Sequence, residues 1–122
     1  MDAYIRSLDM QTIVASKVEA ESFIEMFNKG EAILLDVRYG FEYKVWGLPF
    51  TCNIPLNELP DRLNELPKDK IIVCACPEAV RSNIAKQYLT LKGYNAKFLS
   101  CGMIALMERL KGGKAKDIVL AT

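Results

Sequence analysis

Short apolar runs recur along the chain at intervals that suit strands of a sheet. Residues 32–37 hold five apolar positions in six, without the gaps of a helical face. This pattern predicts a strand buried on both sides. The run at 71–74 has the same character, and shorter runs at 15–18, 52–55 and 96–99 predict further strands.

The intervals between these runs carry apolar residues at helical spacing. Such spacing predicts helices within residues 20–27, 42–46, 59–66, 84–91 and 103–110. Strands that alternate with helices, joined by connections long enough for crossovers, form a parallel or mostly parallel sheet with helices on both faces. The sequence therefore predicts an α/β fold.

The two ends of the chain depart from this alternation. Residues 1–14 place a few apolar residues on one side of a short helix, but residues 12–14 favour an extended backbone. A Gly-Gly pair at 112–113 follows the last predicted helix. We therefore expect an N-terminal extension over 1–14, one domain over 15–112 and a C-terminal tail over 113–122, since 122 residues suffice for a single core.

Composition removes several classes of function. Lys and Arg total 16 against 15 Asp and Glu, which gives no electrostatic argument for nucleic acid or an anionic membrane as partner. No apolar run approaches the roughly 18 residues of a membrane span, and no signal peptide is apparent, so we expect a cytoplasmic protein. Histidine is absent, which excludes Ser-His and Cys-His catalysis and most zinc sites. We expect neither a metal nor a cofactor.

Cys76 stands where the apolar run at 71–74 gives way to a helical pattern. Backbone N–H groups and the positive end of the helix dipole meet at such a junction, and they stabilise a thiolate. We therefore predict a nucleophilic role for Cys76; the alternative is a buried structural thiol. The other cysteines are Cys52, Cys74 and Cys101, and no Cys-x-x-Cys pair supports a zinc site. Cys74 is interpreted as a core residue. Because the sequence shows no export signal, we expect all four cysteines to be reduced thiols.

Several motifs resemble the rhodanese-like domain family in their order and spacing. They are LDVR at 35–38, NIPL at 53–56, LPKDK at 66–70, the loop CPEAVRS at 76–82, and a Gly-Tyr pair at 93–94 that leads to LSCG at 99–102. The resemblance covers roughly residues 15–110. It implies a three-layer α/β fold in which a five-stranded, mostly parallel sheet is flanked by helices.

The resemblance also implies an activity, that of a single-domain sulfurtransferase or persulfide carrier. Cys76 matches the family's cysteine, which accepts a sulfane sulfur from a small donor (thiosulfate, a persulfide or a polysulfide) and passes it to a thiol or protein acceptor. The matching persulfide-binding loop is Pro77, Glu78, Ala79, Val80, Arg81 and Ser82. Four residues separate Cys76 from Arg81, as in sulfur-transferring members, whereas related phosphatases have one more.

The loop departs from the family in two positions. Pro77 has no N–H to offer an anion, and Glu78 adds negative charge beside a thiolate. These residues disfavour thiosulfate and favour an uncharged donor. They also support an alternative, a catalytically weak domain that serves in binding or in redox or sulfur sensing.

Two further expectations concern side chains around the site. Cys101 follows the last predicted strand, which the resemblance to the family implies lies next to the central one, and it is a candidate second thiol that relays sulfur or resolves Cys76. The alternative is a small residue at a tight turn. Arg38 and Glu42 are expected to form an ion pair that fixes the loop after the second strand.

Overall fold

The computed structural model describes residues 1–120, and five parallel strands form its central sheet. The strand order is β1-β5-β4-β2-β3, with β4 in the middle. Within residues 1–120 all strand pairs are parallel, so the expected parallel sheet is confirmed there without an antiparallel member. The strands are β1 Lys17–Val18, β2 Ala32–Asp36, β3 Cys52–Asn53, β4 Ile71–Ala75 and β5 Ala96–Leu99.

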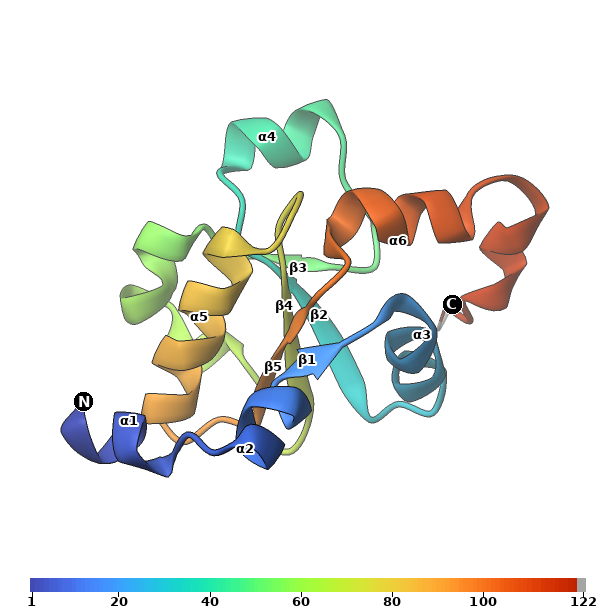
Figure 1. Cartoon of the computed structure of the whole chain (residues 1–122). Helices are drawn as coiled ribbons and strands as arrows, with labels where there is room; N and C mark the ends of the chain where they lie inside the picture. The colour runs from blue at the N-terminus through green and yellow to red at the C-terminus, as the bar shows by residue number, and fades with distance from the viewer. Residues whose placement is uncertain (121–122) are drawn as a thin grey trace.

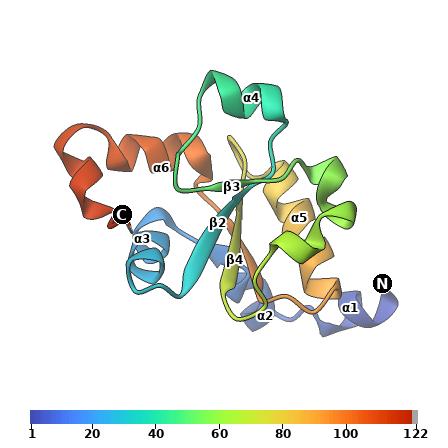
Figure 2. The same cartoon turned by 180° about the vertical axis from the view of Figure 1, so that it is seen from behind.

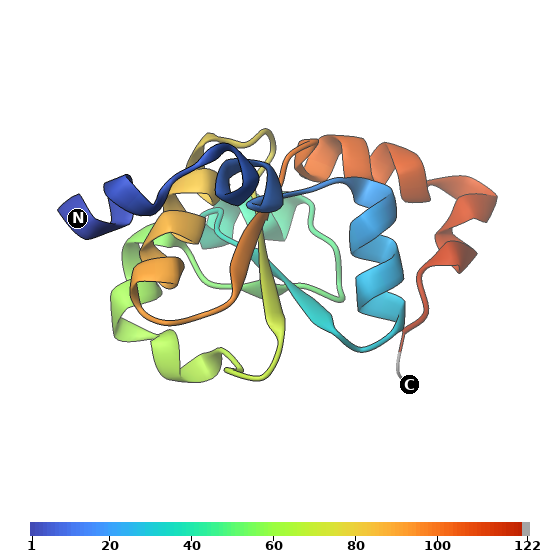
Figure 3. The same ribbon diagram turned by 60° about the horizontal axis from the view of Figure 1, so that its bottom comes forward.

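Helices cover both faces of this sheet, giving the three layers that the alternation predicts (Figure 1). One face packs against α5 and the 3-10 turns between β3 and β4; the other packs against α3 and α6 (Figure 3). The view from behind shows β3 along the edge of the sheet opposite β1 (Figure 2). The helices are α1 Asp2–Ser7, α2 Met10–Ala15, α3 Ala20–Asn28, α4 Gly40–Val45, α5 Val80–Leu91 and α6 Gly102–Leu110.

The apolar runs supply the core as expected. Leu34 and Val73 lie fully buried on the α3 and α6 side, whereas Leu35 and Ile72 are fully buried on the α5 side. Successive residues of a strand point to opposite faces, so a strand buried on both sides needs apolar residues throughout. The two central strands meet that requirement, which fixes β4 in the interior of the sheet.

The segment between β3 and β4 differs from the prediction. Instead of one α-helix over residues 59–66, it forms two 3-10 helices, Leu56–Asp61 and Leu63–Glu65. Pro60 cannot donate a main-chain hydrogen bond, and Pro67 disfavours helical backbone at the residue before it. The leucines at helical spacing still pack inward, with Leu59 fully buried.

The N-terminal residues are helical where residues 12–14 were expected to be extended, so that prediction is wrong. Asp9 caps α2, because its carboxylate accepts a hydrogen bond from the Thr12 backbone at 2.7 Å. A cap of this kind outweighs the β preference of Thr12 and its neighbours. Both short helices lie beside the lower part of α5 in Figure 1 and bury none of their own residues.

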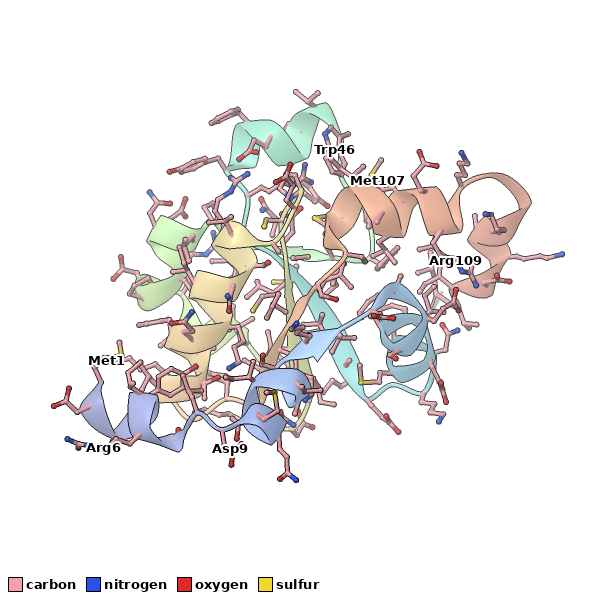
Figure 4. All side chains as sticks on the ribbon, viewed as in Figure 1. Met1, Arg6, Asp9, Trp46, Met107 and Arg109 are labelled. Atoms are coloured by element: carbon pink, nitrogen blue, oxygen red, sulfur yellow. The ribbon has the colours of Figure 1, made fainter. Side chains whose placement is uncertain are left out.

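The C-terminal residues also hold more structure than a tail. A 3-10 helix spans Gly112–Asp117, and Arg109 of α6 pairs both with Asp117 and with Glu21 of α3. Figure 4 labels Arg109 on α6, on the side where α3 and this 3-10 helix lie. Residues 121 and 122 of the expected tail lie outside the described part of the chain.

Candidate active site

Cys76 directly follows β4, in the loop that leads to α5. Its side chain is only 2% exposed, and its Sγ lies 3.4 Å from both the backbone nitrogen and the hydroxyl of Ser82. The Ser82 hydroxyl accepts a hydrogen bond from the Cys76 thiol and donates its own proton to the carbonyl of Ala79 at 3.1 Å. Ser82 belongs to the first turn of α5, so one donor of this turn, the Ser82 backbone N–H, reaches the sulfur.

Cys76 and the loop after it line a small pocket of about 200 Å³. Ser82 lies fully buried behind the sulfur, and Ala79 packs against the core. The structure therefore brings most of the predicted loop residues to one opening. The pocket is lined by Cys76, Pro77, Glu78, Val80 and Arg81.

The first residue of α6, a glycine, packs directly against this loop. Gly102 has a φ of +78°, and a Cβ built there would lie 2.3 Å from the carbonyl oxygen of Pro77. Only glycine tolerates both the conformation and the close approach. The next residue, Met103, donates its N–H to the carbonyl of Cys76 at 2.9 Å. The start of α6 thus fixes the backbone around the cysteine.

Arg81 is held by a carboxylate from a distant part of the chain. Its guanidinium donates two hydrogen bonds to Glu42 of α4, at 2.6 and 3.0 Å. These bonds lower the pKa of Glu42 to about 2 and raise the pKa of Arg81. Glu42 also accepts from the backbone of Tyr39 at 3.0 Å, at the start of α4. The ion pair between Glu42 and Arg81 therefore links α4 to the first turn of α5. This pair was not predicted from the sequence.

The expected ion pair between Arg38 and Glu42 is wrong. Arg38 pairs with Asp36 instead, at 2.8 Å, and both side chains are almost completely buried. The Arg38 guanidinium also donates to the carbonyl of Trp46 and lies 3.9 Å from the centre of its ring. Trp46 is labelled just beyond α4 in Figure 4. Arg38 thus binds the C-terminal end of α4, and Glu42 pairs with Arg81 instead.

The remaining cysteines have different surroundings. Cys74 is fully buried in the core, and burial raises the pKa of its thiol far above the usual range. Cys101 is exposed; partial burial of its thiol raises its pKa, and its sulfur lies 3.5 Å from the carbonyl of Gly102. Within residues 1–120, the hydrogen bonds of the Cys76 sulfur all go to Ser82. The role of Cys101 as a second thiol stays a prediction.

The described residues contain neither a cluster of metal ligands nor a membrane-spanning helix. Among residues 1–120, no three His, Cys, Asp or Glu side chains gather as metal ligands. No helix within the same range has the length and apolar character needed to cross a bilayer.

Comparisons with known proteins agree with the fold. A sequence model described as the rhodanese-like domain matches residues 19–109. The chain therefore belongs to the rhodanese-like domain family. It is 30% identical over 82 residues to a protein named sulfurtransferase from Allochromatium vinosum, a match that covers 66% of this chain and 77% of the relative.

Two further matches show the range of contexts in which similar domains occur. The chain is 41% identical over 83 residues, or 62% of its length, to an HTH-type transcriptional regulator of Mycobacterium tuberculosis, but it spans only 34% of that relative. A crystal structure of a rhodanese-related protein from Thermoplasma volcanium matches with a TM-score of 0.68 and 28% identity, over 76% of this chain and 91% of the other. The chain is thus a rhodanese-like domain that is similar to proteins named as sulfurtransferases.

Proposed function

We propose that this protein is a sulfurtransferase or persulfide carrier, with Cys76 as the residue that accepts and passes on a sulfane sulfur. The observation that supports this most directly is the setting of the Cys76 thiol. It lies at the end of the central strand, within 3.4 Å of the Ser82 N–H and hydroxyl, and it opens to a pocket of about 200 Å³. The backbone N–H at the start of α5 offers a hydrogen bond to the sulfur, and the pocket gives a small donor a route to it.

The transfer takes two displacements at sulfur. The Cys76 thiolate attacks the outer sulfur of a donor persulfide; a new S–S bond forms on Cys76, the donor's S–S bond breaks, and the donor leaves as a thiolate that takes up a proton. An acceptor thiolate then attacks the outer sulfur of the Cys76 persulfide. The acceptor gains the sulfane sulfur, and the Cys76 thiolate is regenerated, so the cycle needs no external oxidant or reductant.

Charges around the pocket favour an uncharged or weakly charged donor over thiosulfate. Glu78 lines the pocket, and the positive charge of Arg81 is already balanced by Glu42 at 2.6 Å. Pro77 offers no N–H to an anion. We therefore propose an organic polysulfide or a low-molecular-weight or protein persulfide as donor, and a thiol or protein thiol as acceptor.

Mass spectrometry of the intact protein tests the proposal. After incubation with polysulfide, the wild-type protein should gain about 32 Da, the mass of one sulfur, at Cys76. The Cys76→Ser variant should lose this adduct, whereas the matched Cys101→Ser variant should keep it. The proposal is wrong if Cys76 remains unmodified, or if the adduct persists unchanged in Cys76→Ser.

A second candidate function is a sensing or binding domain with weak turnover. Two observations favour it: the chain's similarity to a protein named as a transcriptional regulator, and the burial of Cys76 to 2% exposure. The rate of Cys76 alkylation as a function of pH separates the two functions. A thiol pKa near the free value of about 8.5, together with no transfer from any sulfur donor, would favour the sensing domain.

A further inference from the structure

A groove lies between the two N-terminal helices and the surface formed by α5, β1 and β5. It consists of two adjacent cavities of about 210 and 300 Å³ that share Ser16 and Lys86. None of its lining residues lines the Cys76 pocket. We call it the N-terminal groove. The polar residues of its smaller cavity are Tyr4, Ser16, Lys17, Asn83, Lys86 and Gln87.

Lys86 is the unusual residue of the N-terminal groove. It lies on α5 with only 5% of its surface exposed, and its ammonium donates to the hydroxyl of Tyr4 at 3.2 Å. A lysine ammonium has three protons to donate. Within residues 1–120, no carboxylate lies within 4.0 Å of it. A cation removed from water with one neutral partner is costly, so such a site favours an anion.

The other charges of the groove have the same sign. Lys17 lines the smaller cavity and Lys97 the larger, and no Asp or Glu lines either one. The nearby carboxylate of Asp9 is occupied, because it accepts hydrogen bonds from the backbone and the hydroxyl of Thr12. Figure 4 shows Asp9 directed away from the body of the protein. The positive potential of the lysines is therefore not balanced at the groove itself.

We propose that the N-terminal groove binds a small oxyanion, such as phosphate or a carboxylate, through Lys86. Lys17 adds charge, and the amide groups of Asn83 and Gln87 supply further donors at the cavity wall. The smaller cavity is below the roughly 300–1,000 Å³ of pockets for drug-sized ligands, which restricts it to a small ion or molecule. This site is independent of sulfur transfer at Cys76.

NMR titration of the full-length protein tests this site. Inorganic phosphate and acetate are added separately at constant ionic strength, and the backbone amide shifts are mapped. We expect saturable shifts at Ser16, Asn83 and Gln87 with at least one of these anions. In Lys86→Met, affinity should fall about tenfold or more, because a charge-assisted hydrogen bond is lost. Lys114→Met removes an exposed lysine elsewhere and should bind as the wild type does.

Tyr4→Phe keeps the proposal testable if Lys86→Met does not fold. This variant removes the one hydroxyl that binds Lys86 and leaves the ammonium in place. We expect the anion affinity to stay within about threefold of the wild-type value, because Lys86 itself carries the interaction. Shifts confined to residues 76–82, or no saturable shift with either anion, would overturn the site. Equal affinities of wild type and Lys86→Met would overturn it as well.

Discussion

Replacing Glu42 by glutamine tests whether the bridge from α4 to Arg81 supports the cysteine loop. The substitution keeps the shape of the side chain but removes its charge. In the folded protein the pKa of Glu42 falls from 4.5 to about 2, mainly through its hydrogen bonds with Arg81. This difference corresponds to an upper bound of about 3 kcal/mol. Both side chains are partly exposed, at 24% and 31%, so solvent screening reduces the expected loss to about 1–2 kcal/mol.

The loss of stability caused by Glu42→Gln should depend on pH in a defined direction. A carboxyl whose pKa is lower in the folded state adds stability that is complete above its unfolded pKa, here 4.5, and disappears as the pH falls toward about 2. The amide that replaces the carboxyl in Glu42→Gln does not titrate. The difference in free energy of unfolding between the wild type and this variant should therefore be constant from about pH 6 to 7 and shrink steadily below about pH 4.5.

Urea denaturation at several pH values measures this difference. Trp46 is the single tryptophan and lies against Arg38, so its fluorescence reports on unfolding near α4. Glu25→Gln serves as the matched control, since it breaks an exposed pair with Lys29 and should leave stability unchanged. The reasoning fails if Glu42→Gln is as stable as the wild type at pH 7, or if the loss is equally large at pH 3.

Two further substitutions address the cysteine loop. Ser82→Ala removes a buried hydroxyl that accepts a hydrogen bond from the Cys76 thiol at 3.4 Å and donates one to the Ala79 carbonyl at 3.1 Å, and it should lower the free energy of unfolding in urea by about 1–2 kcal/mol; stability equal to that of the wild type would contradict the contribution of these hydrogen bonds. Gly102→Ala places a Cβ 2.3 Å from the Pro77 carbonyl at a φ of +78°, and should cost about 3 kcal/mol or more in thermal denaturation. Gly113→Ala, which meets no atom within 4 Å, is its control, and comparable stability of the two variants would refute the packing argument.

The layers of the fold were predictable because they rest on local patterns. The continuous apolar runs at β2 and β4 identify strands buried on both faces, and alternation with helices then requires parallel pairing. The wrong predictions concern segments in which opposing short-range effects act on the same residues. Asp9 caps a helix that β-branched residues disfavour, and Pro60 helps convert an expected helix into 3-10 turns. Helix and strand propensities alone do not determine the structure of these two segments.

The partners of charged residues in the site depend on tertiary position, which sequence spacing does not reveal. Arg38 and Glu42 are four residues apart and look like a local pair, yet Arg38 meets Asp36 because that pair is buried against Trp46. Glu42 then meets Arg81, 39 positions away, only because α4 folds over the start of α5. The positive charge of Arg81 at the pocket is thereby balanced. The net charge at the pocket thus depends on a contact between distant segments, which the loop sequence alone does not reveal.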